Sequence, residues 1–466
     1  MIAVPVIAIF DIGKTNKKFF LIDESYQIVL ERSVQFEEIK DEDGDTCDDV
    51  HMLTKWVEKT LTEILQLKKF DVKAVNFSAY GASLVYINEE GKVIAPLYNY
   101  LKTYPGKIKH ALYEKYGGAE KISCETASPV LGSLNSGMQL YRMKIENPEL
   151  YNQLKYALHL PQYLSYIISA KAYSDITSIG CHTQLWDYQK NNYHDWVITE
   201  GVAKKLAPIH SSNATDKINF QGKPLKTGIG LHDSSAALIP YLAVFQEPFV
   251  LISTGTWCIS LNPFNNTGLT NEELNKDCLC YMEYQGRPVK ASRLFAGNEH
   301  GLQTKKLAAH FDKPADFYKK IKYNAALVQQ LQKKYSFDRP LKKNGTNIYS
   351  SVFQTRDLAT FKNYEEAYHC LLLDIMLQQY SSTKLVLSGS KVSRIFVDGG
   401  FSNNSIYMHL LALAFPNMEV YAASVAQATA MGAALAIHRE WNTSPVPADM
   451  VKLKYYKVSD VAVSDN

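Results

Sequence analysis

Apolar and polar positions along the chain predict strands and helices in alternation. An apolar run over residues 6–10, a polar turn, and a second run over residues 17–23 predict a β-hairpin. Apolar residues at helical spacing predict a helix over residues 50–67, and shorter runs predict strands over residues 72–77 and 84–87. Strands that alternate with helices favour an α/β architecture.

The same layout restarts about midway along the chain. Before that point, residues 150–168 have helical spacing and predict one further helix. Buried strands are then predicted over residues 249–254 and 395–400, and each leads into a glycine-containing turn, as the first strand does. Three such turns, with one opening each half, indicate two related domains that face each other. We expect these domains to span residues 1–243 and 244–466.

Composition and charge exclude several classes of protein. The 466 residues are 46% hydrophobic and 21% charged, which is typical of a globular protein with two or three domains. A net charge of +3 argues against a dedicated nucleic-acid-binding protein. Seven cysteines without a C-x-x-C pair argue against a disulfide-rich secreted module. We therefore expect reduced, mostly buried cysteines in a cytoplasmic protein.

The apolar start of the chain predicts neither a signal peptide nor a membrane anchor. Residues 1–10 lack a basic leader and a small-residue cleavage site. A membrane span needs about 20 apolar residues, which is far longer than this run. We expect no membrane partner.

The turn at residues 11–18 has the composition of a phosphate-binding loop. A tight turn after a buried strand directs successive backbone N–H groups toward one point, and Gly13 lets a ligand approach closely. Asp11, at the end of the strand, could hold Mg²⁺ through water. The side chains that add donors or positive charge are Lys14, Thr15, Asn16, Lys17 and Lys18. The alternative is a solvated hairpin turn with a lysine-rich rim, because the Walker pattern G-x-x-x-x-G-K-[ST] is absent.

Two later turns offer similar chemistry without charge. Gly255 and Thr256 supply backbone amides and a hydroxyl after the strand at residues 249–254. Gly399 and Gly400 precede a predicted helix over residues 405–415, for which Ser402 and Asn403 are candidate N-caps. A helix N-terminus approached by two glycines can accept the flat or anionic parts of a nucleotide. An ordinary strand–turn–helix connection would have the same pattern.

A carboxylate stands at the start of another predicted helix. Asp233 follows His232 and precedes a run of small residues that ends at Ala237. Such an aspartate is usually a structural cap, but in a cleft it can accept the proton of a substrate hydroxyl. Residues 427–434 predict a second helix of small residues, which lets a backbone or a flat ring approach closely.

In this order, the motifs resemble those of the FGGY family of carbohydrate kinases. Residues 11–18 are similar to its first phosphate loop, residues 230–237 to its catalytic-base motif, and residues 253–257 to its second phosphate loop. Gly399-Gly400 and residues 428–434 resemble its adenosine-side elements. The resemblance implies an α/β protein with two actin-like (ribonuclease H-like) ATPase domains that face a central cleft.

The resemblance also implies roles for individual residues in ATP-dependent phosphorylation of a sugar. Asp233 would be the catalytic base and would contact both the sugar and the metal, and Asp11 would position Mg²⁺. The residues implied to bind ATP are Gly13, Thr15, Asn16, Lys18, Gly255, Thr256, Gly399, Gly400 and Asn403. The sugar-binding residues implied are Tyr80, Gly81, Tyr98 and Asn99, together with Asp233.

The sugar side departs from the family pattern. Tyr80 stands where the family has His or Trp, and Tyr100 and Lys102 stand where it has Asp and Arg. Lys14 and Gln427 are departures on the nucleotide side, where Thr and Glu are usual. The Gly-Thr-Trp loop and the segment around Tyr98 are most similar to the rhamnulose, fuculose and xylulose kinase branch. The resemblance thus implies a 6-deoxy-ketohexose or a ketopentose as substrate.

Two other functions fit parts of the pattern. The same fold could serve as a sugar- or nucleotide-binding regulator or pseudokinase, although both Asp11 and Asp233 are present. An ATPase of the actin or chaperone type would leave the Gly-x-His-Asp segment without a purpose. The partners expected are a sugar, ATP and, by resemblance to the family, a second copy of the chain in a homodimer.

Overall fold

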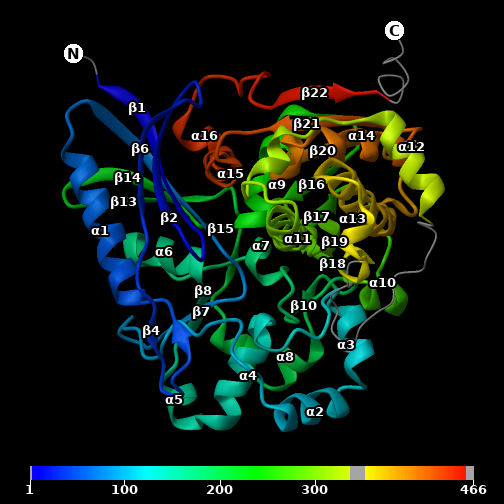
Figure 1. The fold of residues 1–466 in the computed structure, drawn as a ribbon. Helices are drawn as coiled ribbons and strands as arrows, with labels where there is room; N and C mark the ends of the chain where they lie inside the picture. Colours follow the sequence, from blue (N-terminus) through cyan, green and yellow to red (C-terminus); the bar gives the residue numbers. More distant parts are fainter. Residues whose placement is uncertain (1–2, 336–351, 458–466) are drawn as a thin grey trace.

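Two mixed β-sheets form the centres of the two halves of the chain (Figure 1). The computed structural model describes residues 3–335 and 352–457. Among them, the first sheet has the order β13-β14-β6-β1-β2-β3, with β15 beside β6. Its strands are β1 (Val4–Ile12), β2 (Lys17–Asp23), β3 (Ile28–Val34), β6 (Phe70–Ala79), β13 (Thr215–Phe220), β14 (Lys223–Gly228) and β15 (Leu231–His232).

The second sheet repeats the arrangement of the first. Its order is β18-β19-β17-β16-β20-β21-β22. In each half the first strand pairs antiparallel with the next strand and parallel with a later one: β1 with β2 and β6, and β16 with β17 and β20. The strands are β16 (Phe249–Thr254), β17 (Cys258–Asn262), β18 (Cys278–Met282), β19 (Pro288–Leu294), β20 (Arg394–Gly399), β21 (Glu419–Ser424) and β22 (Lys452–Tyr456). This repetition confirms the prediction of two related domains.

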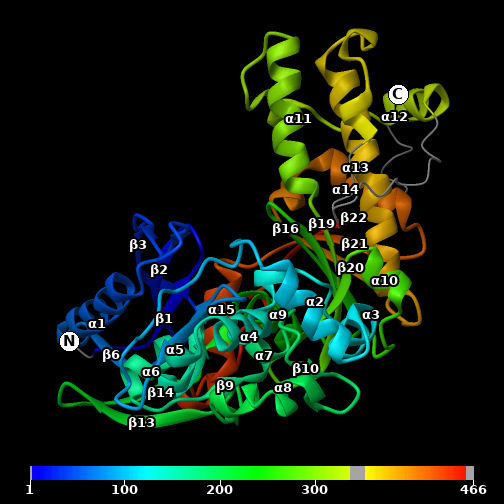
Figure 2. The ribbon, with the colours of Figure 1, turned by 90° about the horizontal axis from the view of Figure 1, so that it is seen from below.

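Helices pack on both sheets and between them. Helix α1 (Val50–Gln66) begins at Asp49, whose carboxylate accepts hydrogen bonds from the N–H groups of His51 and Met52, and it buries an apolar face that includes Leu53 and Val57 against the first sheet. Figure 2 shows α11 (Ala296–His310) and α13 (Tyr364–Leu387) side by side at the far end of the second half. This half also contains α10 (Asn271–Asn275), α12 (Ala325–Lys334), α14 (Ser405–Ala414), α15 (Ala428–Ala436) and α16 (His438–Trp441).

Helices α9 (Asp233–Val244) and α15 lie between the two sheets (Figure 1). They pack closely because both are built from small residues: a Cβ at Gly432 would lie 1.8 Å from the carbonyl oxygen of Ala236. One apolar core joins these helices to both sheets and includes Ile7 of β1 and Leu251 of β16. The two halves therefore share a core and are not joined by a linker alone.

Most of the segment between β6 and β13 forms the lower part of the molecule (Figure 1), while α6 packs against β6 of the first sheet. It has its own core, which includes Leu84, Leu112 and Trp196. Its helices are α2 (Gly106–Lys115), α3 (Ala119–Glu125), α4 (Ser136–Glu146), α5 (Pro148–Gln153), α6 (Leu160–Ser169), α7 (Ile176–Ile179) and α8 (Asp195–Thr199). Its strands are β7 (Leu84–Ile87), β8 (Tyr156–His159), β9 (Ser174–Asp175), β10 (Trp186–Asp187), β11 (Asn192–Tyr193) and β12 (Ile209–His210). In the loop between β3 and α1, two short strands, β4 (Ile39–Lys40) and β5 (Thr46–Cys47), pair with each other.

The single helix predicted over residues 150–168 is wrong. The chain forms α5, then the strand β8, then α6. Leu154 is extended with ψ 123°, and β8 pairs antiparallel with β7, so tertiary pairing outweighs the helical spacing of the apolar residues. Pro161 lies in the first turn of α6, where a missing N–H costs nothing.

The other predicted elements are present, with small shifts of their ends. The hairpin β1–β2, helix α1 and strands β6, β7, β16 and β20 all lie where the pattern places them. All seven cysteines are free, and all but Cys124 are buried. In the described part of the chain, no helix combines the length and apolar character needed to cross a membrane.

Candidate active site

Two carboxylates from different elements meet between the halves. Asp11 lies near the end of β1, and its carboxylate accepts a hydrogen bond from Thr429 Oγ1 of α15 at 2.6 Å. Burial raises the pKa of Asp11 to about 6; the Thr429 bond opposes this shift, and the charge of Asp233 adds to it. Strand β6 runs parallel to β1 on one side and to β15 on the other, and it pairs Ser78 with Asp11 and Ala79 with His232, so Asp11 and Asp233 lie at the same edge of the first sheet.

Asp233 is the first residue of α9 and not its N-cap. The N-cap is His232, which makes no side-chain capping bond. Asp233 Oδ1 accepts a hydrogen bond from the N–H of Ser234 at 2.6 Å, while Oδ2 has no donor among the described residues. Burial raises the Asp233 pKa to about 6, although the side chain keeps 32% of its exposure. An oxygen without a donor on a partly exposed carboxylate can accept a proton.

The first loop forms the predicted tight turn. The N–H of Gly13 donates to the carbonyl of Asn16 at 2.9 Å, and Thr15 and Asn16 are exposed at its tip. The Asn16 side-chain oxygen accepts a hydrogen bond from Gln35. Lys18 Nζ donates to Gln427 Oε1 at 3.2 Å, so the loop contacts the second half of the chain. The turn is therefore docked across the two halves and does not stand free in solvent.

Two lysines of this loop do not supply free positive charge, contrary to expectation. Lys14 Nζ lies 2.6 Å from Asp48 Oδ2 and 2.9 Å from Glu38. Lys17 is only 2% exposed, and its Nζ lies 2.9 Å from Asp48 Oδ1. Burial disfavours the charged form of Asp48, but hydrogen bonds from Lys14, Tyr80 and Lys17 outweigh it and lower the Asp48 pKa. Internal pairing thus neutralises most of the loop's charge.

Tyr80 and Gly81 lie beside these groups. The Tyr80 hydroxyl donates to Asp48 Oδ2 at 2.7 Å, and its ring meets that of Tyr100 edge-on at 6.1 Å. A Cβ at Gly81 would lie 2.8 Å from the His232 ring, so only glycine allows this strand end to approach the residue before Asp233. Tyr100 is close enough to Asp233 for that charge to raise the Tyr100 pKa, after the larger effect of burial.

The second and third turns are tied together at the ends of β16 and β20. Thr254 Oγ1 donates to the Asp398 carbonyl at 2.5 Å and accepts from the N–H of Phe401 at 3.0 Å. Gly399 has φ +88°, and a Cβ there would lie 2.0 Å from the Thr254 carbonyl oxygen, so the position requires glycine. The parallel pairing of β16 and β20 places both turns at the same edge of the sheet.

The predicted N-caps of the helix after the third turn are wrong. Residues Gly400–Asn403 form a short 3₁₀ turn, and the carboxamide of Asn404 caps α14 by accepting from the N–H groups of Ile406 and Tyr407. Ser402 instead donates to the Gly399 carbonyl. The extra 3₁₀ turn moves the N-cap one residue beyond Asn403, so the Asn403 side chain does not cap the helix.

A cavity of about 650 Å³ opens next to these two turns. Three predicted ATP-binding residues line it: Gly255, Gly400 and Asn403. Thr256 and Gly399 belong to the same turns but not to its wall. The remaining lining combines rings, lysines and small residues: Gly297, His300, Tyr318, Lys319, Ile321, Lys322, Phe401, Asn404, Ser405, Lys454 and Tyr456. Aromatic walls with a few placed cations suit a flat base and an anionic tail.

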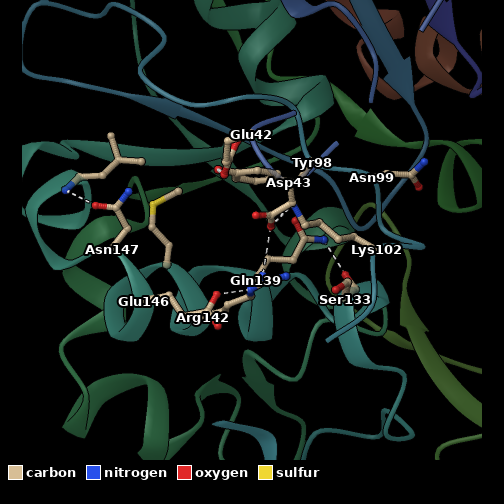
Figure 3. Close-up of a pocket in the computed structure, with 12 residues that line it drawn as sticks. Glu42, Asp43, Tyr98, Asn99, Lys102, Ser133, Gln139, Arg142, Glu146 and Asn147 are labelled. Carbon is tan, nitrogen blue, oxygen red and sulfur yellow. Dashed lines mark hydrogen bonds and ion pairs between the residues drawn. The ribbon is translucent and has the colours of Figure 1, made fainter. Parts of the chain in front are cut away.

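Tyr98 and Asn99 lie in a different cavity, of about 360 Å³ (Figure 3). Tyr98 donates to Glu42 at 2.5 Å, and Asn99 donates to the Thr46 carbonyl. Lys102 Nζ lies 2.5 Å from Asp41 and 2.7 Å from Asp43, so it holds an acidic loop. Among the described residues, none of these forms a hydrogen bond or ion pair with Asp233, whereas the Tyr100 ring of the same segment meets that of Tyr80. The structure therefore divides the four predicted sugar-binding residues between two places.

Family comparison agrees with this geometry. Residues 6–232 match the N-terminal domain of the FGGY family of carbohydrate kinases, and residues 246–445 match the C-terminal domain of carbohydrate kinase FGGY. The chain belongs to the FGGY family. Helix α9, which carries Asp233, lies between the two matched regions. The resemblance drawn from the motifs is confirmed.

Solved FGGY structures share the fold along nearly the whole chain. A carbohydrate kinase from Novosphingobium aromaticivorans is 22% identical, with a TM-score of 0.79 over 99% of this chain and 96% of that one. A xylulose kinase from Lactobacillus acidophilus is 15% identical, with a TM-score of 0.78 over 98% and 95%. These likenesses confirm the α/β fold with two actin-like domains.

A curated relative matches over a shorter stretch. A rhamnulokinase of Mannheimia succiniciproducens is 24% identical over 263 residues, which is 54% of this chain and 52% of the relative. The match thus spans about half the length of that relative.

Two residues of the site gave no signal in the sequence. Asp48 binds Lys14, Lys17 and Tyr80, but it is about 30 residues from each, and no motif surrounds it. Thr429 contacts Asp11 across 418 residues of chain. The sequence predicts a small-residue helix over the run that contains Thr429, and the structure packs this helix closely against α9 through Gly432.

Proposed function

We propose that the chain catalyses ATP-dependent phosphorylation of a sugar hydroxyl, with Asp233 as the general base. The observation that carries this proposal is the position of Asp233 and Asp11 at the same edge of the first sheet, together with a nucleotide-sized cavity that the two later turns line. The sugar hydroxyl gives its proton to Asp233 as its oxygen attacks the γ-phosphorus, and ADP leaves. Phosphoryl transfer mainly requires positioning and charge neutralisation, which facing loops supply.

The nucleotide residues fall into three groups. Gly13, Thr15, Asn16 and Lys18 of the β1–β2 turn bind the phosphates from one side. Gly255 and Thr256 bind them from the other. Gly399, Gly400 and Asn403 hold the adenosine part. The exposed tip of the first loop and the glycines at the cavity wall support these roles, because backbone N–H groups there can reach an anion.

Asp11 and Asp233 fit a Mg²⁺ ion. Each is a carboxylate oxygen donor, and each pKa is raised mainly by burial; for Asp11, the charge of Asp233 raises it further. A bound cation between such groups relieves their repulsion, and hard cations prefer carboxylates and phosphates. When bound, Mg²⁺ would neutralise charge that develops on the phosphates. The chain's own contribution is to hold the two carboxylates in place through Thr429 and Ser234.

The substrate that we propose is a ketose, a 6-deoxy-ketohexose or a ketopentose. Tyr80 and Gly81 line its site beside Asp233, and Tyr98 and Asn99 act from the segment that also carries Tyr100. Relatives that are named as a rhamnulokinase and as xylulose kinases support this class. Tyr100 occupies the position at which the family pattern has an aspartate. Asp48 places a carboxylate near Tyr100 instead.

We also propose an organisation into two domains. Residues 1–243 form the N-terminal domain with the sugar site, the first phosphate loop and the base, and residues 244–466 form the nucleotide-binding domain. The enzyme acts in the cytoplasm as a homodimer. The alternative of a binding regulator has no supporting observation, since both acidic residues are in place.

A panel of sugars tests the proposal. Purified protein is given Mg²⁺-ATP with each of a set of ketoses, aldoses and polyols, and ADP release is measured. We expect one ketose to stimulate turnover strongly. Turnover without any sugar would instead indicate an ATPase, and tight sugar binding without turnover would indicate a regulator.

Asp233→Asn gives the matched residue test. We expect the rate of sugar phosphorylation to fall by about 10²–10⁴-fold, the contribution of a general base, while ATP binding stays within a few-fold of the parent protein. Binding of a fluorescent ATP analogue serves as the control for folding. Activity retained above about a tenth of the parent rate would contradict the assignment of the base.

A further inference from the structure

A group of buried soft ligands lies directly behind Asp233. One ligand atom from each of Cys181, His182 and His232 lies within 4.8 Å of the others. The three residues are 1%, 8% and 3% exposed. Cys181 Sγ is 3.2 Å from His232 Nε2, and the same nitrogen is 3.3 Å from Asp233 Oδ1. One sulfur and two imidazoles thus converge at one point, and the Asp233 carboxylate lies beside one of these imidazoles.

A hydrogen bond fixes the tautomer of His182, and a longer contact favours the same tautomer for His232. His182 Nδ1 lies 3.2 Å from the Leu134 carbonyl, which can only accept, so Nδ1 carries the proton. His232 Nδ1 faces Ser235 Oγ at 3.5 Å, and that hydroxyl already donates to the Met282 carbonyl, so it accepts from His232. Each ring therefore keeps its lone pair on Nε2. Anchoring of the distal N–H in this way is what orients histidines that bind metals.

The charges in this group suit a divalent cation. A Cys181 thiolate and the Asp233 carboxylate together carry two negative charges, which one divalent ion neutralises. The nearby cation, Arg293, is already paired with Asp277 at 2.8 Å. The Asp233 side chain is 32% exposed, which gives an ion access from the side of the carboxylate. Three ligands of the S, N and N types, with water as the fourth, are typical of tetrahedral zinc sites.

We propose that Cys181, His182 and His232 bind Zn²⁺ or a similar borderline-soft divalent cation, with water as the fourth ligand, and that occupancy stops phosphorylation. Binding replaces the thiol proton of Cys181, so one proton is released for each ion bound. The ion on His232 Nε2 lies beside Asp233, whose Oδ1 is 3.3 Å from that nitrogen, and its positive charge makes this carboxylate a weaker acceptor for the sugar proton. Only the inhibitory consequence rests on the proposed function; the metal site itself does not.

Co²⁺ and Zn²⁺ titration of the metal-free, full-length protein tests the site. We expect one Co²⁺ per chain, with the thiolate-to-metal absorption band and the visible bands of a tetrahedral complex, and displacement by Zn²⁺. Cys181→Ser removes the thiolate band. Cys181→Ser and His182→Gln each weaken Zn²⁺ binding by more than the roughly 10–100-fold that loss of a supporting residue costs.

Two variants serve as matched controls. Cys124→Ser removes a partly exposed thiol whose Sγ lies 2.8 Å from Asn271 Oδ1 and which is not part of this group. His194→Gln alters the other candidate metal-binding group among the described residues, a histidine with two carboxylates, in which His194 Nε2 is 2.8 Å from Glu125. Both should bind Zn²⁺ as the parent does. Loss of binding in His194→Gln, or full binding in Cys181→Ser, would overturn the proposed site.

Proton release and kinetics complete the test. Zn²⁺ added to the parent protein in weak buffer should release one proton for each ion, a measurement that needs no variant to fold; release of none overturns thiolate ligation. At fixed Mg²⁺-ATP, Zn²⁺ should then inhibit the parent enzyme. Binding without inhibition of an active kinase overturns the regulatory role. Binding through Cys181 in a protein that phosphorylates no sugar keeps the site and rejects the proposed function.

Discussion

At the scale of single residues, Asp48 connects the phosphate side to the sugar side. Its carboxylate receives Lys14 and Lys17 from the first loop and Tyr80 from the strand end beside Asp233. Lys14 and Tyr80 are two positions at which this chain departs from the family pattern. Because both departures meet at one buried carboxylate, they form a single arrangement and are not independent substitutions.

Asp48→Asn should destabilise the protein and impair catalysis. It leaves the Lys17 ammonium, 2% exposed, without an anionic partner. Breaking a buried pair in this way costs about 3–5 kcal/mol, so we expect a clearly lower melting temperature. The KM values for both ATP and sugar should rise, because the same carboxylate holds residues on both sides.

The neighbouring Asp49 provides the control for this change. Asp49 caps α1, and asparagine is as good an N-cap as aspartate. Asp49→Asn should therefore melt within about a degree of the parent protein. Equal melting temperatures for the two variants would show that Asp48 is not needed to hold the loop.

At the scale of elements, side-chain clusters hold helices together in the lower part of the molecule. The Glu200 carboxylate, at the end of α8, accepts hydrogen bonds from Lys115 Nζ of α2 and Lys144 Nζ of α4, each at 2.6 Å. It also accepts one from the Tyr116 hydroxyl at 2.7 Å. Burial opposes the charged form, but these hydrogen bonds outweigh it and lower the Glu200 pKa to about 2. One carboxylate thus joins three helices.

This cluster should make stability depend on pH below about 5. The folded-state pKa lies below the unfolded value of about 4.3, so the contribution is present above the unfolded pKa and is lost as pH falls toward 2. Glu200→Gln should lower stability by about 1 kcal/mol at pH 7, after screening by solvent, and the difference from the parent should shrink at pH 3. Glu114→Gln, on the exposed face of α2, should have no effect at either pH. Melting temperatures measured across this range check both expectations; a difference that is constant with pH would contradict the role of the charge.

At the scale of the whole molecule, the contact of α9 with α15 joins the two halves. Asp233 begins α9, and Thr429, which binds Asp11, lies on α15. The distance between these helices therefore sets the position of the base relative to the first phosphate loop. Asn76 of β6 adds a hydrogen bond to the Ala433 carbonyl at 2.8 Å.

Gly432→Ala should separate these helices and lower both stability and activity. The new Cβ would lie 1.8 Å from the Ala236 carbonyl, and overpacking of this kind costs about 1–3 kcal/mol. Gly301→Ala is the control, because α11 has open space at Gly301, and alanine in a helix is favoured there by about 1 kcal/mol. The melting temperature should fall for Gly432→Ala and rise for Gly301→Ala. The kcat should fall only for Gly432→Ala. A neutral Gly432→Ala would show that the two helices can move apart freely.

Local signals in the sequence predicted much of the fold and part of the site. The strand-then-glycine turns placed Gly255, Gly400 and Asn403 at one cavity, because parallel strands of one sheet end at the same edge. The spacing of apolar residues failed at residues 154–159, where pairing with β7 favours a strand. The spacing of apolar residues indicates which side chains a segment buries, but not which strand or helix it packs against.

The sequence by itself determined the order of the elements, the repeated halves, the glycine turns and Asp233 at the start of a helix, since each depends on residues close together in the chain. The tertiary structure alone decided which charges are free. It paired Lys14 and Lys17 with Asp48, joined Asp11 to Thr429, and placed Cys181 and His182 behind His232. These contacts join residues tens to hundreds of positions apart. Burial then changes their chemistry, because the protein interior makes an unpaired charge costly and a paired one unavailable to a ligand.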